Sequence, residues 1–154
     1  MADTSVHHTA EAWIVEFGLP QHFAGESFGG KKMKLTWGGF FAFDAVNQSE
    51  TVVVAISTSS AVTATGKQAT AKFQKLKTDA LYLLHLDAKT RCVMVFTEES
   101  MLQYFKKAAL AGRFPPSIEL LHIPLPAELH AKVLASRLVA SRETSPIAAP
   151  IDVL

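Results

Sequence analysis

The sequence predicts a single α/β domain in which helices flank a mixed β-sheet. Its length of 154 residues is the usual size of one domain. The first half carries three short extended segments joined by turn signals, which is typical of antiparallel strands. The second half alternates helical with extended segments, which is typical of parallel strands. The expected order of elements is α-β-β-β-α-β-β-α-β-α.

The first half begins with a short helix and continues with strands. The helix is expected at residues 9–17, where Gly18 and Pro20 end it. Turn signals then separate three extended segments. These predicted strands cover residues 31–36, 40–46 and 51–58. The third of them is rich in Val and Ile and apolar on both faces, so we expect it to lie in the middle of the sheet.

The second half predicts three helices separated by strands. Ala69, Phe73, Leu76 and Ala80 recur at helical spacing. Thr97 is a suitable N-cap for the next helix, and Pro126 opens the last one. The intervening strands are expected at residues 81–86, 91–96 and 118–123. We therefore expect a flexible N-terminus at 1–8, one domain at 9–142 and an irregular C-terminal tail at 143–154.

Composition excludes some functional classes and leaves others open. Lys plus Arg total 15 and Asp plus Glu total 14, so any nucleic-acid binding must come from a local patch rather than from net charge. The single cysteine, Cys92, lies in an apolar run and cannot form an internal disulfide. No signal peptide and no apolar run of membrane-spanning length is found, so we expect a cytoplasmic protein without membrane contact.

The segment around Asp44 and Ser57 carries the strongest functional signal. Asp44 stands late in the second predicted strand, and the third strand ends in the small polar residues 57–59. A lysine-containing helix follows. An acid at a strand end can bind a metal ion, or it can cap the following turn. The pattern leaves both interpretations of Asp44 open.

This layout resembles the restriction-endonuclease-like (PD-(D/E)XK nuclease) superfamily over residues 9–123. In that family a first acid and an E-x-K pair converge on one metal site, because residues two apart on a strand share a face. Asp44 matches the first acid, with Phe43 in place of the proline. Ala55 and Ser57 stand where the second acid and the lysine are required. The resemblance therefore implies the nuclease fold without the ordinary catalytic set.

The helix that follows offers replacements for the missing groups. Gln68, Lys72, Lys75 and Asp79 fall on one polar stripe, which is either a solvated face or part of the site. In the catalytic interpretation Asp44, Ser57 and Lys72 form the site, and Asp44 is the metal ligand. In the binding interpretation a cationic and polar set contacts phosphates. That set is Lys67, Gln68, Lys72 and Lys75.

Two functions follow from these patterns. The absence of E-x-K favours a non-catalytic module without a cofactor, whose partner is nucleic acid, another protein or a second copy of the chain. The alternative is a Mg²⁺-dependent phosphodiesterase with a rearranged site. Trp37 and Phe40 either stack on bases or fill the core.

Overall fold

The computed structural model describes residues 4–144, and it describes side chains up to residue 140. Its centre is a five-stranded sheet with neighbours in the order β1-β2-β3-β4-β5. The strands are β1 (Phe28–Lys34), β2 (Phe40–Asn47), β3 (Val52–Ser57), β4 (Arg91–Phe96) and β5 (Ile118–His122). β1, β2 and β3 pair antiparallel, whereas β3, β4 and β5 pair parallel. The expected mixed sheet flanked by helices is confirmed.

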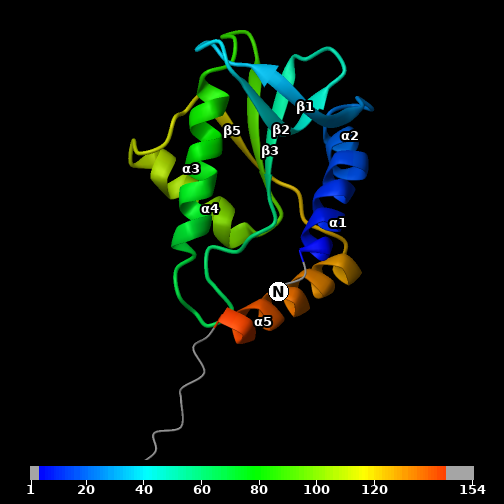
Figure 1. Ribbon diagram of the computed structural model, residues 1–154, viewed down its shortest axis with the longest axis vertical. Coiled ribbons are helices and arrows are strands. Elements are labelled where there is room, and N and C mark those ends of the chain that lie inside the picture. Colours follow the sequence, from blue (N-terminus) through cyan, green and yellow to red (C-terminus); the bar gives the residue numbers. More distant parts are fainter. Residues whose placement is uncertain (1–3, 145–154) are drawn as a thin grey trace, which may run out of the picture.

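Helices cover both faces of the sheet (Figure 1). The parallel strands need crossover connections, and α3 (Thr70–Leu84) and α4 (Glu99–Leu110) supply them on one face. The other face is covered by α1 (Ser5–Trp13), the π-helical segment η1 (Ile14–Gly18) and α2 (Leu19–His22). The last helix, α5 (Ala127–Thr144), lies across the bottom of the view and contacts α1.

Two apolar cores fill the space between the sheet and its helices. On the α3 and α4 side, the large buried side chains include Phe73, Phe96 and Phe105. On the α1 side, Ile14 and Leu19 pack against alternate residues of the central strands. Every residue of β3 is buried, which confirms the central position expected from its two apolar faces.

The strand expected at 81–86 is wrong, because α3 continues through Leu84. The buried residues Phe73, Leu76, Ala80 and Leu83 form one stripe at helical spacing, and that stripe keeps the segment helical. Leu81 and Leu84 lie on the outer face with 46% and 43% of their surfaces exposed. The observed order therefore has one strand fewer than the predicted order.

The N-terminal helical segment is longer than expected at both ends. It begins at Ser5 rather than at residue 9, so residues 5–8 of the expected flexible N-terminus lie in a helix. It continues past Gly18, where an added Cβ would lie 3.0 Å from Cγ2 of Ile123. Pro20 falls in the first turn of α2, where the lack of an N–H group is tolerated. Of the expected C-terminal tail, residues 145–154 lie outside the described residues.

Candidate functional site

The candidate site lies where β2 and β3 separate. The two strands pair only at Ala45–Val54 and Val46–Val53. The second half of β3 is therefore not paired with β2. At this point the Asp44 carboxylate accepts a hydrogen bond from the backbone N–H of Ile56 at 2.8 Å. The side chain of Asp44 thus replaces a missing bond of the β-ladder.

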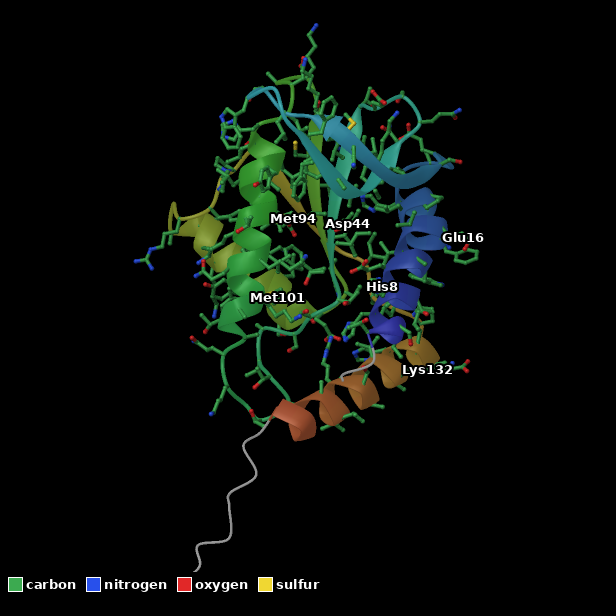
Figure 2. The ribbon with its side chains drawn as sticks, viewed as in Figure 1. His8, Glu16, Asp44, Met94, Met101 and Lys132 are labelled. Carbon is green, nitrogen blue, oxygen red and sulfur yellow. The ribbon has the colours of Figure 1, made fainter. Side chains whose placement is uncertain are left out.

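Asp44 does not cap the turn that follows β2. That role belongs to Asn47, whose side-chain oxygen accepts the backbone N–H groups of Thr51 at 2.8 Å and Val52 at 2.9 Å. The turn-capping interpretation of Asp44 is therefore wrong. Its carboxylate is directed toward the free edge of β3, and Figure 2 shows Asp44 in the space between α1 and α3.

A cleft of about 300 Å³ opens beside the free end of β3. It lies between α1 and α3, and Figure 2 shows His8 on the α1 side. Its polar lining consists of Thr4 before α1, His7, His8 and Glu11 from α1, residues 57–59 at the end of β3, and Lys72 and Lys75 from α3. Three elements that are distant in sequence therefore form one polar concavity.

The structure brings some of the expected site residues together and separates others. Ser57, Lys72 and Lys75 line the cleft, although Ser57 is itself buried. Lys67 and Gln68 do not line it, since both precede α3. Lys67 closes a tight turn by accepting the Thr63 N–H at 2.7 Å, and Gln68 forms an isolated bridge with Val62. The expected polar stripe on α3 therefore lacks Gln68.

Glu11 is, with His7 and His8, among the site residues that could not be predicted from the sequence. Burial raises the pKa of Glu11, and the negative charge of Asp44 raises it further. Burial likewise raises the pKa of Asp79, with Lys75 acting against this shift and Asp44 adding to it. Three carboxylates from α1, β2 and α3 are thus close enough to influence one another. Glu11 lies four residues after His7, so both belong to the cleft-facing side of α1.

Positive groups balance part of this acidic charge. Lys75 donates to the Asp79 carboxylate at 3.3 Å, and its own side chain stays 64% exposed. Lys72 is also exposed. Burial lowers the pKa of His7, and the charges of Arg137 and Lys72 lower it further, so this imidazole is uncharged at neutral pH. The two lysines of the cleft lining, Lys72 and Lys75, both come from α3 and are exposed to an approaching ligand.

The end of β3 is held in place from two sides. The Thr58 hydroxyl makes a hydrogen bond to Nδ1 of His7 at 2.8 Å, and the Thr58 carbonyl accepts one from Arg137 of α5. Arg137 also contacts the Glu98 carboxylate at 3.0 Å, and His130 contacts the same oxygen at 3.0 Å. These polar contacts fix the floor of the cleft against α1 and α5.

The second half of β3 supplies no carboxylate or lysine beside Asp44. Ala55, where the nuclease resemblance would place the second acid, is buried in the apolar core on the α3 side. Ser57, where that resemblance would place the lysine, is also buried. Within residues 4–144, no group of three or more His, Cys, Asp or Glu side chains is arranged to hold a metal ion. The Asp44 carboxylate is engaged instead by a backbone N–H.

Comparison with protein-family models, with curated proteins and with solved structures finds no match to this chain. None of the helices in the described part of the chain has the length and apolar composition that crossing a membrane requires.

Proposed function

We propose that this chain is a non-catalytic module that binds the phosphate backbone of nucleic acid at the cleft between α1 and α3. The observation that carries the proposal is the presence of Lys72 and Lys75 beside the hydroxyl-rich end of β3 in one concavity. Lysine side chains contact phosphates as point charges, and hydroxyl groups donate hydrogen bonds to phosphate oxygens.

The acids of the site are compatible with a phosphate at the mouth of the cleft. The Asp79 side chain is only 13% exposed and is paired with Lys75. Burial and Asp44 raise the pKa of Glu11, which favours its uncharged form. Asp44 accepts the Ile56 N–H. The exposed lysines therefore meet an approaching anion before the half-buried carboxylates do.

The finer fold assignment is part of this proposal. A restriction-endonuclease-like fold with an incomplete catalytic set is supported by the layout around the site. Asp44 lies late in β2, β3 ends in small polar residues, and the lysines lie on the helix that follows. The missing acid and lysine at Ala55 and Ser57 support binding without hydrolysis.

Charge reversal in the cleft tests the proposed function. The double variant Lys72→Glu/Lys75→Glu should bind a fluorescently labelled oligonucleotide at least about tenfold more weakly than the wild type in anisotropy titrations. Lys106→Glu/Lys107→Glu on α4 is the matched control, because it changes the same charge at exposed positions outside the cleft. Equal losses in the two variants would mean that only overall charge matters and would refute a cleft site.

The alternative function is a metal-dependent phosphodiesterase with a rearranged site. It is favoured by one observation, the mutual influence of Glu11, Asp44 and Asp79. Isothermal titration with Mn²⁺ tests it directly. Binding by the wild type that disappears in Asp44→Asn would support the phosphodiesterase and overturn the non-catalytic proposal.

A further inference from the structure

The hairpin of β1 and β2 has two faces of opposite character. Residues directly opposite one another in an antiparallel pair share a face. Met33 faces Phe41, and this face packs toward α3, where Phe41 stacks on Tyr82 with ring centroids 4.2 Å apart. The opposite face is formed by two other pairs. These pairs are Lys34 with Phe40 and Lys32 with Ala42.

This second face, which we call the Phe40 face, is exposed. Phe40 keeps 66% of its surface in contact with solvent, although the neighbouring aromatic residue Phe43 is only 4% exposed. Lys32, Lys34 and Ala42 are exposed beside it. Neither of these two lysines forms an ion pair with any residue of the described chain. An exposed ring is thus flanked by free positive charge.

The Phe40 face continues toward the candidate site. Side chains alternate along a strand, so Phe40 and Ala42 lie on the same side of β2, and Asp44 follows two residues later, where the register of β2 against β1 shifts. Asp44 stands at the end of this row, where β2 and β3 separate beside the cleft. Four residues of extended strand span about 13 Å. A bound chain on the Phe40 face would therefore lead into the site already described.

The positive charge of the Phe40 face favours nucleic acid over a second copy of the chain as its partner. β1 is an edge strand, and a second copy that paired its own β1 there would bring additional lysines close to Lys32 and Lys34. A polyanion with exposed ring systems matches both the lysines and the unburied Phe40. Unpaired bases of nucleic acid provide those ring systems, whereas paired bases are enclosed in the duplex.

We propose that the Phe40 face binds single-stranded nucleic acid, with an unpaired base stacked on Phe40 and the adjacent phosphates held by Lys32 and Lys34. This inference rests on the proposed function and specifies the form of nucleic acid that it takes. Stacking on an aromatic side chain tolerates any base, because every base has a π-face. The module should therefore prefer single strands to duplexes without reading a particular sequence.

Anisotropy titrations with a labelled thymidine oligonucleotide and with a duplex of equal length test this inference. Phe40→Ala should weaken single-strand binding about 5- to 100-fold, and duplex binding less than about twofold. Phe40→Trp should restore single-strand binding, because it restores a stacking surface. Leu110→Ala on α4 is the control, since Leu110 is 89% exposed and lies outside both surfaces.

Thermal unfolding establishes that the variants are folded. Because Phe40 is largely exposed, Phe40→Ala should unfold at nearly the wild-type temperature. If it does not, Phe40→Leu keeps the apolar bulk, removes the aromatic ring and serves as the test variant. In either variant, loss of single-strand binding in a folded protein supports the inference.

The possible failures are distinguishable. Wild-type affinity of Phe40→Ala for the single strand, or equal losses on single strand and duplex, would overturn the inference. If Lys72→Glu/Lys75→Glu still loses binding in that case, the proposed function stands. No binding of either oligonucleotide by the wild type would overturn both proposals. Self-association that Phe40→Ala abolishes, without any effect on oligonucleotide binding, would assign the Phe40 face to a second copy and overturn the inference.

Discussion

The sharpest quantitative prediction concerns the salt dependence of binding at the cleft. Lys72 and Lys75 are the lysines that line it, so Lys72→Ala/Lys75→Ala removes up to two phosphate contacts. Each contact to a single strand contributes about 0.7 to the slope of log K against log salt concentration, so the slope should fall by about 1.4. At a salt concentration of about 0.15 M this change corresponds to about 14-fold weaker binding.

The assay is a series of anisotropy titrations at increasing salt concentration. Lys75 is already paired with Asp79, so Lys75→Ala alone should reduce the slope less than Lys72→Ala alone. Lys106→Ala/Lys107→Ala on α4 removes the same charge and should leave the slope unchanged. A wild-type slope in the cleft double variant, or a smaller effect of Lys72 than of Lys75, would refute the reasoning.

Two further predictions concern the acids of the site. Asp44→Ala leaves the Ile56 N–H without its acceptor and should lower the free energy of unfolding by about 1–3 kcal/mol in urea titrations, whereas an unchanged value would contradict a structural role for this bond. Burial and the Asp44 charge raise the pKa of Glu11, so the folded state binds the Glu11 proton more readily than the unfolded chain, and ionised Glu11 disfavours folding at neutral pH. Glu11→Gln should therefore be more stable than the wild type at neutral pH. This advantage should shrink as the pH falls through the raised pKa toward the ordinary value of 4.5, and an advantage that does not change with pH would contradict the reasoning.

The sheet could be predicted from the sequence because its signals are local. β2 and β3 carry apolar residues bounded by turn signals. The observed bounds of each strand differ from the predicted bounds by no more than one residue at either end. The central place of β3 followed from its two apolar faces. Such patterns can be interpreted without the tertiary contacts, because the alternation of apolar and polar residues indicates whether one or both faces of a strand are buried.

The mistaken strand at 81–86 shows where local signals become ambiguous. Leu81, Tyr82, Leu83 and Leu84 form a short apolar run that fits a strand as well as a buried stretch of helix. Only the stripe that starts at Phe73 and reaches Leu83 separates the two possibilities. Leu81 and Leu84 lie on the exposed face of α3, and their exposure depends on how α3 packs on the sheet. The sequence does not show this packing, so the apolar run alone predicts a buried strand.

The site was predictable only in part for a similar reason. Lys72 and Lys75 follow β3 closely along the chain, so the pattern placed them near its end. Glu11 reaches the cleft from α1, and its closeness to Asp44 depends on how α1 packs on the sheet. No sequence spacing encodes that contact. Likewise, turn residues around Trp37 and Phe40 do not reveal that the two rings are 60% and 66% exposed.

The hydrogen bond from the Ile56 N–H gives Asp44 a structural role. The sequence pattern alone predicts a metal ligand at this position, yet the fold also needs a hydrogen-bond acceptor where β2 and β3 separate. An amide oxygen accepts the same bond, so Asp44→Asn should keep most of the stability that Asp44→Ala loses. If nucleic-acid binding also survives in Asp44→Asn, the acid serves as a structural acceptor. If binding or metal affinity is lost while stability is kept, the negative charge itself has a function at this site.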